Sequence, residues 1–374
     1  MARILELTNY TKGGCGVGMR VLKEAQLLAS RGHKVAIFST NLEKGTDKIC
    51  SGDENVNGVA IKRFPAKKLG GESYMNWNFT KEALDFKPEV IITHAYRHLH
   101  TTQALKIAKK LGCKVFLVTH APFARESSRT ILQNAVVSAY DLFIGKRKLK
   151  EFSKIIAITK WEQKYLHKLG VKKENIAYIP NGLSDEFFKP INFRRGPVKK
   201  IVYIGRISSI KSLETASMAL VLAPEYTFKI RGPADPEYLK KLQELIKKNN
   251  LGKREIIEPQ SYISQEQIDI LDQSDVYVLP SKSEGMPQTL IEAMARGKIV
   301  VSSNNPGSAE LIVDGKNGFL FPISNSKALA QVLKRIQQLS IKERITIQKQ
   351  ARKTAEQFRW SDIIDNLELV LNSN

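Results

Sequence analysis

Residues 275–297, DVYVLPSKSEGMPQTLIEAMARG, predict a buried strand, a tight loop and a helix, in that order. The first five residues are a β-branched and aromatic run that Pro280 ends. A helix is predicted over Gln288–Arg296, where apolar residues recur at helical spacing, and Pro287 then falls in the first turn, where proline is best tolerated. The first amides of such a helix lack intrahelical partners and lie at the positive end of its dipole. The loop is therefore predicted to bind an anion, and phosphate is the expected one.

Two carboxylates flank this loop: Glu284 lies before the helix and Glu292 lies inside it. At a rise of about 1.5 Å per residue they reach points several ångströms apart, so they do not form a tight acid/base pair. That separation suits hydroxyl groups on either side of a diphosphate, such as those of a sugar and a ribose. The alternative is a pair of surface glutamates stabilised by the helix dipole.

The rest of the chain alternates predicted strands with helices, which is typical of a parallel α/β fold. In the first half the predicted strands are 3–8, 34–39, 59–64, 90–93, 114–119, 154–159 and 176–179. A polar, proline-containing linker follows Pro180, and the pattern begins again with strands at 200–205, 226–231, 256–257, 275–279, 299–302 and 319–321. We therefore predict two Rossmann-like domains, 1–183 and 198–354, and a final helical segment, 355–374, with Ser361 as its N-cap.

Glu284 and Glu292, with seven residues between them, resemble the paired glutamates of the family-four retaining glycosyltransferases. The resemblance runs over nearly the whole chain and implies the GT-B fold, with two Rossmann-like domains facing a central cleft and a C-terminal helix crossing back to the first domain. It also implies transfer of a hexosyl group from a UDP- or GDP-sugar to an acceptor hydroxyl. By position, Glu284 would meet the donor sugar and Glu292 the ribose.

In the same family the backbone between the two glutamates holds the diphosphate, which points here to Gly285, Met286, Pro287, Gln288 and Thr289. Many members carry glycine where this chain has Pro287, so one phosphate-facing amide is absent. The amides of Gln288 and Thr289 must then provide a larger share of the hydrogen bonds to the diphosphate.

Arg206 and Lys211 follow the first strand of the second domain and match the basic pair that the family places on the departing nucleoside diphosphate. Cleavage of a glycosyl–phosphate bond leaves negative charge on the leaving oxygen, and fixed cations stabilise that charge in the transition state. With two cations and a helix end, no metal and no other cofactor is expected. Each base taken alone is also compatible with a solvated surface position.

Gly13-Gly14-Cys15-Gly16-Val17-Gly18 lies between a strand and a helix predicted from Met19 to Arg31. Glycines in such a loop permit positive φ angles and close approach of the backbone to a ligand. A dinucleotide fingerprint would have its third glycine one residue later and an acidic residue at the end of the second strand, where this chain has Thr40-Asn41. The resemblance instead places this loop over the donor phosphates and the acceptor, with Gly14 and Gly16 as the expected contacts.

In open parallel sheets ligands bind at the carboxyl ends of the strands. His120 follows the strand at 114–119, at a position where the family often has a histidine that meets the donor sugar at the reacting centre. A hydrogen-bonded structural role is the alternative. The residues expected on the acceptor side are His94, Arg97, Arg125 and Asn181. The spacing of His94, His98 and His100 matches no metal site.

Composition indicates a folded protein: 42% of the 374 residues are hydrophobic and 26% are charged, and no run approaches the ~18 apolar residues of a membrane span. The N-terminus lacks a signal-peptide pattern, and three cysteines fit neither paired disulfides nor a zinc site. These features predict a cytoplasmic protein.

The formal charge of +22 is concentrated in the first half. Residues 1–183 carry 31 Lys and Arg against 15 Asp and Glu, a net charge of +16, and the remainder carries 28 against 22, a net charge of +6. Such a surface favours anionic partners, although it also simply aids solubility. Aromatic residues near lysines at 74–79, and the basic run 146–150, suit the cytoplasmic face of a membrane and a lipid-linked or phosphorylated acceptor glycan; a solvated face is the alternative.

We therefore interpret the chain as a metal-independent hexosyltransferase whose partners are a nucleotide-sugar donor and a glycan acceptor. A nucleotide-sugar epimerase or a phosphorylase on the same fold is one alternative. A nucleic-acid-binding protein is another, motivated by the charge, but the sequence lacks an RNA-binding motif or a basic helix–turn–helix pattern, so no nucleic-acid partner is expected.

Overall fold

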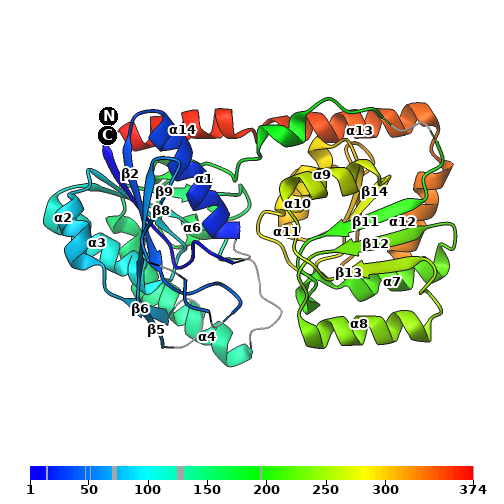
Figure 1. Ribbon diagram of the computed structural model, residues 1–374, viewed down its shortest axis with the longest axis horizontal. Helices are drawn as coiled ribbons and strands as arrows, with labels where there is room; N and C mark the ends of the chain where they lie inside the picture. Colours follow the sequence, from blue (N-terminus) through cyan, green and yellow to red (C-terminus); the bar gives the residue numbers. More distant parts are fainter. Residues whose placement is uncertain are drawn as a thin grey trace. The chain divides into compact units, whose positions relative to one another are not determined.

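The computed structural model describes residues 1–13, 16–46, 48–50, 52–69, 74–123, 130–193 and 196–373. The chain divides into two compact units (Figure 1). The first comprises Met1–Phe123, Arg129–Gly182 and Ser361–Asn374, and the second contains Leu183–Trp360. The change from the first unit to the second thus falls next to the predicted boundary at 183, whereas residues 355–360 lie in the second unit and not in the final segment.

The first unit is built on an eight-stranded sheet in the order β10-β9-β8-β7-β1-β2-β4-β3. All neighbouring strands are parallel except β3 and β4. The strands are β1 (Arg3–Leu7), β2 (Lys34–Thr40), β3 (Glu54–Val56), β4 (Val59–Phe64), β7 (Val90–His94), β8 (Lys114–Val118), β9 (Lys154–Ala157) and β10 (Ile176–Tyr178), and a separate hairpin holds β5 (Ala66–Lys68) and β6 (Met75–Trp77). The predicted parallel sheet is confirmed, and the short strands β3, β5 and β6 were not predicted.

Helices connect these strands, as the parallel pairing requires. They are α1 (Gly16–Ser30), α2 (Thr80–Phe86), α3 (Leu99–Leu111), α4 (Ile131–Tyr140), α5 (Lys146–Lys148) and α6 (Gln163–Lys168). A π-helical turn, η2 (Asp141–Gly145), joins α4 to α5, and short 3₁₀ turns follow at η3 (Leu149–Glu151) and η4 (Lys173–Asn175).

The second unit has a six-stranded, all-parallel sheet in the order β13-β12-β11-β14-β15-β16. Its strands are β11 (Lys200–Ile204), β12 (Thr227–Arg231), β13 (Glu255–Glu258), β14 (Val276–Leu279), β15 (Ile299–Ser303) and β16 (Phe319–Phe321). Its helices are α7 (Leu213–Leu222), α8 (Pro236–Lys248), α9 (Ser264–Asp272), α10 (Gln288–Ala295), α11 (Pro306–Leu311), α12 (Ser326–Gln338) and α13 (Ile341–Glu356), with 3₁₀ turns η5 (Asp185–Phe188) and η6 (Ser209–Lys211). This is the second Rossmann-like unit that the sequence predicts.

The last helix, α14 (Trp360–Asn372), packs on the first unit beside α1, and the two chain ends lie close together (Figure 1). Arg31 reaches Asp365 at 2.5 Å and also pairs with Glu368, which His33 contacts at 2.9 Å. The predicted C-terminal helix on the first domain is therefore present. Ser361 lies inside this helix and is not its N-cap.

Two local predictions change in the folded chain. Gly16 and Gly18 lie in α1, so the glycine loop is shorter than predicted. Within the loop, Gly13 has the positive φ angle, 83°, and a Cβ there would lie 2.5 Å from the backbone oxygen of Lys44. In the aromatic segment 74–79, Trp77 and Phe79 are buried at 2% and 0% exposure, and Tyr74 is the aromatic residue that stays exposed, at 46%.

Among the described residues, none of the helices combines the length and apolarity needed to cross a bilayer.

Candidate functional site

The loops after β11 and β14 lie side by side because these two strands are parallel neighbours in the second sheet. The amide of Lys282 donates to the backbone oxygen of Ile210 at 2.8 Å and ties the loops together. Lys211 thereby places its Nζ 2.7 Å from Oε1 of Glu284, with both side chains mostly shielded from solvent. The structure thus brings together a predicted leaving-group cation and the predicted sugar-binding carboxylate.

The loop ends at α10, which begins at Gln288 as predicted. The position of Pro287 differs from the prediction. Pro287 is the N-cap, with extended backbone (φ −75°, ψ 92°), and not the first helical residue. It supplies no side-chain cap, and its carbonyl accepts from the amides of Leu290 and Ile291. A helix start without a side-chain cap leaves its dipole open to an anionic ligand.

Gly307, in α11, packs closely against the backbone of this loop. A Cβ at this position would lie 2.4 Å from the backbone oxygen of Gly285 and 2.8 Å from that of Glu284, so only glycine allows the two segments to approach so closely. Asn305 caps α11 through Ser308 and donates to the backbone oxygen of Ser281 at 3.3 Å. Residues 307–310 are therefore part of a helix, α11, that supports the site.

Glu292 lies in α10 and accepts a hydrogen bond from Gln267 of α9. Burial raises the pKa of the Glu292 carboxyl to about 7, although the Gln267 amide lowers it. Nearby, the Tyr277 hydroxyl donates to Oγ1 of Thr289 at 2.6 Å. Gln288 and Thr289 are partly buried, as are Gly285 and Met286.

Arg206 stands on the same loop as Lys211 but differs in exposure. Its side chain is exposed, no ion pair joins it to any residue that the structure describes, and its backbone oxygen accepts from the Tyr203 hydroxyl at 2.8 Å. Arg206 is therefore available for a ligand, whereas Lys211 is already paired.

In the first unit, His120 follows β8 and has a left-handed backbone, φ 58°, as does Ala121, φ 53°. Such angles cost about 1 kcal/mol or more for residues other than glycine and are often found at functional sites. His120 Nε2 lies 3.0 Å from Nδ1 of His94, and Nε2 of His94 lies 3.0 Å from Oε2 of Glu6. Glu6 was not predicted as a site residue; the only sequence signal is a charged residue within the apolar strand RILEL.

The other predicted acceptor-side residues have structural partners. Arg97 forms a bidentate pair with Asp141, at 2.8 and 2.6 Å, and donates to the backbone oxygen of Pro122 at 3.0 Å. Asn181 accepts from Nη1 of Arg20 at 2.9 Å. Gly16 begins α1, and a Cβ added there would meet no other described residue within 4 Å, while Gly14 and Arg125 lie outside the described residues. The acceptor-side roles therefore remain predictions.

A potential metal-binding group exists where the sequence predicts none. Ligand atoms of Glu6, Glu24 and His94 lie within 4.8 Å of one another in the buried part of the first unit. Two hydrogen bonds already occupy this group, because Arg20 donates to Glu24 at 3.0 Å and His94 meets Glu6. The nearby guanidinium also disfavours a cation.

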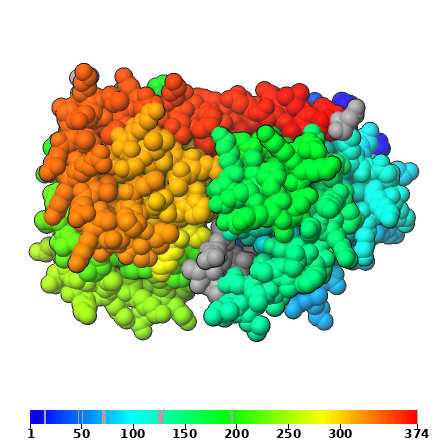
Figure 2. Space-filling model, turned by 180° about the vertical axis from the view of Figure 1, so that it is seen from behind, coloured from blue at the N-terminus to red at the C-terminus, as the bar shows by residue number. Residues whose placement is uncertain are grey.

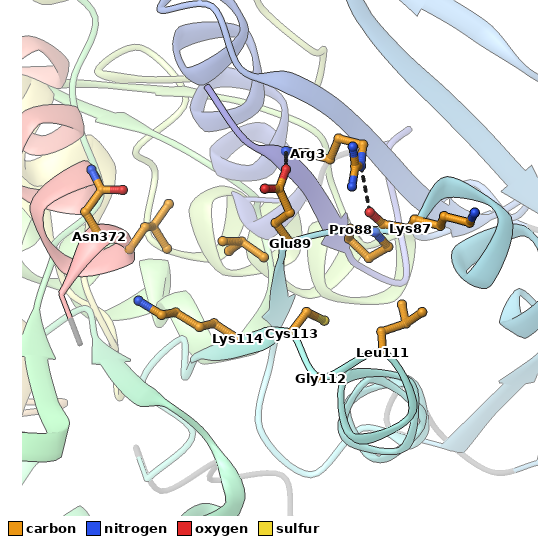
Figure 3. A pocket seen from close by; sticks show the side chains of 11 residues that line it. Arg3, Lys87, Pro88, Glu89, Leu111, Gly112, Cys113, Lys114 and Asn372 are labelled. Atoms are coloured by element: carbon orange, nitrogen blue, oxygen red, sulfur yellow. Dashed lines mark hydrogen bonds between the residues drawn. The ribbon is translucent and has the colours of Figure 1, made fainter.

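The first unit also has a hollow of about 610 Å³, shown in Figure 3. It lies at the amino ends of β1, β7 and β8 and is lined by Arg3, Glu89, Cys113, Lys114 and Asn372 among others. The backbone amide of Arg3 donates to Oε2 of Glu89 at 2.9 Å, and Nε of its side chain donates to the backbone oxygen of Lys87 at 2.7 Å. The hollow is thus at the opposite end of the sheet from His120.

Comparison with known proteins agrees with this arrangement. Residues 14–187 match the family model described as Glycosyltransferase Family 4, and residues 184–354 match the model described as Glycosyl transferases group 1. The chain belongs to the family-4 glycosyltransferases. It is therefore an enzyme that transfers sugars.

Individual relatives are distant. The putative colanic acid biosynthesis glycosyltransferase WcaL of Escherichia coli K12 is 28% identical over 287 residues, which is 73% of this chain and 68% of that protein. Among solved structures, the sucrose-phosphate synthase of Thermosynechococcus elongatus superimposes with a TM-score of 0.77 at 19% identity, covering 99% of this chain and 98% of that one. Anabaena HepE, solved in complex with UDP and glucose, gives 0.77 at 18% identity with 100% of both chains covered. These likenesses establish the GT-B fold of this glycosyltransferase.

Proposed function

We propose that this glycosyltransferase takes a hexosyl group from a nucleoside diphosphate sugar, with UDP or GDP as the nucleotide, and transfers it to an acceptor hydroxyl with retention of configuration. The observation that carries the proposal is the Lys211–Glu284 pair, 2.7 Å apart, next in sequence to the uncapped start of α10. The carboxylate suits sugar hydroxyls, and the cation and helix start suit a diphosphate.

The chemistry follows from where charge develops. The bond between the anomeric carbon and the diphosphate oxygen breaks, and its electron pair stays on that oxygen. Lys211, which has two further ammonium hydrogens beyond the one given to Glu284, and the exposed Arg206 stabilise this charge. The acceptor oxygen forms the new bond on the face that the phosphate leaves, and its proton passes to the departing phosphate. No protein nucleophile and no metal ion enters this scheme.

His120 is the proposed contact in the first unit for the donor sugar. It is partly exposed at the carboxyl end of β8, which is the end at which open parallel sheets bind ligands. Glu292, Gln288 and Thr289 are proposed to hold the ribose and the phosphates, since their loop and helix continue from Glu284. The complex of HepE with UDP and glucose supports such a donor by analogy.

The acceptor is proposed to be a lipid-linked glycan at an anionic membrane face. The segment from α4 to η3 carries exposed apolar side chains beside exposed bases, and Figure 2 shows part of it (turquoise) on the surface of the first unit. The apolar residues are Ile131, Leu132, Val136, Leu142, Phe143 and Ile144, and the bases are Lys146, Arg147 and Lys150. Apolar side chains enter the interface while neighbouring cations meet anionic headgroups.

The test of the donor is a thermal-shift screen of UDP- and GDP-sugars against the wild type and Lys211→Ala. A ligand at about 100 times its Kd adds about 2.7 kcal/mol to stability. A matched control is Lys229→Ala, which removes another lysine in an ion pair of the same unit, 2.9 Å from Glu258. A donor should stabilise the wild type and the control and stabilise Lys211→Ala less. Equal stabilisation of all three proteins would contradict the proposed site.

A further inference from the structure

Glu6, His94 and His120 form one continuous line of hydrogen bonds across three neighbouring strands of the first unit. The two distances in this line are both 3.0 Å, from Oε2 of Glu6 to Nε2 of His94 and from Nδ1 of His94 to Nε2 of His120. Glu6 and His94 are fully buried at 0% exposure, whereas His120 is partly exposed. The line therefore runs from a carboxyl in the protein interior to the imidazole proposed to meet the donor sugar.

A neutral imidazole has one N–H donor and one bare nitrogen acceptor, so the line has only two consistent arrangements. If Glu6 is ionised, it accepts from His94, His94 accepts from His120, and Nδ1 of His120 is a bare acceptor. If Glu6 is protonated, every bond reverses, and Nδ1 of His120 carries a hydrogen that it can donate. The proton on Glu6 thus decides what His120 offers to a ligand.

The surroundings favour the second arrangement. Burial raises the pKa of Glu6 well above its usual range, and Glu24 of α1 raises it further, while Arg20 opposes both. Arg20 directs its hydrogen bonds to Glu24 and Asn181 and to the backbone oxygen of Ile179. Among the described residues, Oε1 of Glu6 has no hydrogen-bond partner, as expected for a carboxyl that is not charged.

The two imidazoles are themselves neutral. Burial lowers the pKa of both His94 and His120 well below the usual range. Neighbouring groups lower the pKa of His94 further; they are His120, Arg20 and His100. The groups that lower the pKa of His120 are Arg20, His98 and Lys44. No second proton is therefore present to disturb the order of donors in the line.

The backbone holds the exposed end of the line in place. Arg97, anchored on Asp141, donates to the backbone oxygen of Pro122 at 3.0 Å and so fixes the left-handed turn at His120 and Ala121. At the end of β7, Nε2 of His100 donates to the backbone oxygen of His94 at 2.9 Å. Both histidines of the line are thus held by contacts outside it.

We infer that Glu6 is a positioning residue which, through His94, holds His120 in the tautomer that carries its hydrogen on Nδ1 and presents it as a donor to an oxygen of the bound sugar. The role of His120 toward the sugar rests on the proposed function. The tautomer itself does not, and the experiment separates the two.

The first measurement is the ring tautomer of His120, read by two-bond ¹H–¹⁵N correlation spectra of protein labelled with ¹⁵N-histidine and free of donor. Only six histidines occur in the chain, and His120→Asn assigns the signal. The wild type and Glu6→Gln should both show hydrogen on Nδ1, because the glutamine amide can donate to His94 as a protonated carboxyl does. Glu6→Met, which cannot donate, should show a mixture. Hydrogen on Nε2 of His120 in the wild type would overturn the inference.

The second measurement is turnover, followed as nucleoside diphosphate release from the donor found in the screen. Glu6→Gln should keep kcat within about twofold, and Glu6→Met should lower kcat about tenfold or more, as expected when a catalytic imidazole is held wrongly. KM for the donor should change little in either variant. Glu255→Met is the matched control, because it removes a buried carboxyl from the second unit, and neither the tautomer nor kcat should change.

The outcomes are distinguishable. If His120→Asn leaves turnover unchanged while the predicted tautomer is observed, the proposed role of His120 is wrong and the tautomer control by Glu6 stands. If Glu6→Gln folds, as judged by thermal unfolding, but loses activity as Glu6→Met does, the donor arrangement is wrong. Bound metal in the purified protein that disappears in Glu6→Gln would assign Glu6, Glu24 and His94 to a cation instead.

Discussion

Nζ of Lys211 lies 2.7 Å from Oε1 of Glu284, although the two residues are 73 positions apart in the chain. The pair joins a cation suited to a leaving phosphate to a carboxylate suited to a sugar. If the proposed function is right, we expect a change in either residue to affect both ends of the glycosyl–phosphate bond.

Lys211→Ala or Arg206→Ala should lower kcat by about 10²-fold or more, which is the scale found when one group that stabilises an oxyanion is removed. Turnover is measured as nucleoside diphosphate release, with Lys229→Ala as the control. A folded Lys211→Ala/Arg206→Ala double variant with turnover close to the wild type would show that these bases do not serve the leaving group.

Turnover should persist in excess EDTA, because Lys211, Arg206 and the start of α10 already provide positive potential for the diphosphate. The measurement is the initial rate after dialysis against EDTA, with and without added Mg²⁺ or Mn²⁺. A rate that is lost in EDTA and restored by either ion, in a protein that stays folded, would indicate a metal-assisted reaction instead.

Donor affinity should rise with pH through about 7, because burial raises the pKa of Glu292 to about 7 and only its ionised carboxylate accepts hydrogen bonds from ribose hydroxyls through both oxygens. Binding should release a fraction of a proton at neutral pH, which calorimetry in buffers of different ionisation enthalpy detects. Glu292→Gln should bind more weakly and release no proton. Proton release that persists in Glu292→Gln would assign the effect to another group.

Burial raises the pKa of Glu255 from 4.5 to about 7. The free energy of unfolding should therefore fall as the pH rises from about 4.5 to about 7, because Glu255 becomes ionised in this range. Its protonated form favours the folded state, so this contribution is complete below the unfolded pKa and is lost on passing the folded one. Relative to Glu255→Gln, the wild type should lose up to about 3 kcal/mol of unfolding free energy across this window, at about 1.4 kcal/mol per pKa unit. Urea unfolding of both proteins at several pH values measures the difference; parallel pH profiles would disprove the shift.

The protein should bind anionic vesicles better than neutral ones, and binding should weaken with salt, because exposed charges are screened beyond about 8 Å at physiological ionic strength. Reversal of Lys146, Arg147 and Lys150 to Glu should weaken sedimentation with vesicles and leave donor affinity unchanged. Lys148 is kept, since it donates to Thr102 at 2.7 Å.

A matched control reverses three exposed lysines of α8, Lys240, Lys241 and Lys247, which lie in the second unit. Equal binding of the wild type to neutral and anionic vesicles would favour a soluble acceptor. So would an equal loss of vesicle binding in the two triple variants.

Local sequence patterns determined the two Rossmann-like halves. Strand and helix periods can be read within ten residues, and the order strand–loop–helix around Glu284 depends only on neighbours in the chain. Parallel pairing then places all carboxyl ends at one edge of a sheet, which is why Arg206, Lys211 and Glu284 could be predicted at the same edge. Helix and loop boundaries were less well determined, as the helical Gly16 and the N-cap Pro287 show.

Which strand ends meet was decided only by the tertiary structure. Lys211 reaches Glu284 because β11 and β14 are neighbours although β12 and β13 separate them in the chain, and Glu6 reaches His120 because β1, β7 and β8 lie next to one another. Burial was decided there too: nothing local indicates that Trp77 turns inward or that Glu6 loses its contact with water, and it is this loss of water that raises the pKa of Glu6. The sequence therefore determined which chemical groups stand at the strand ends, and long-range packing determined which of them meet and in what state of charge.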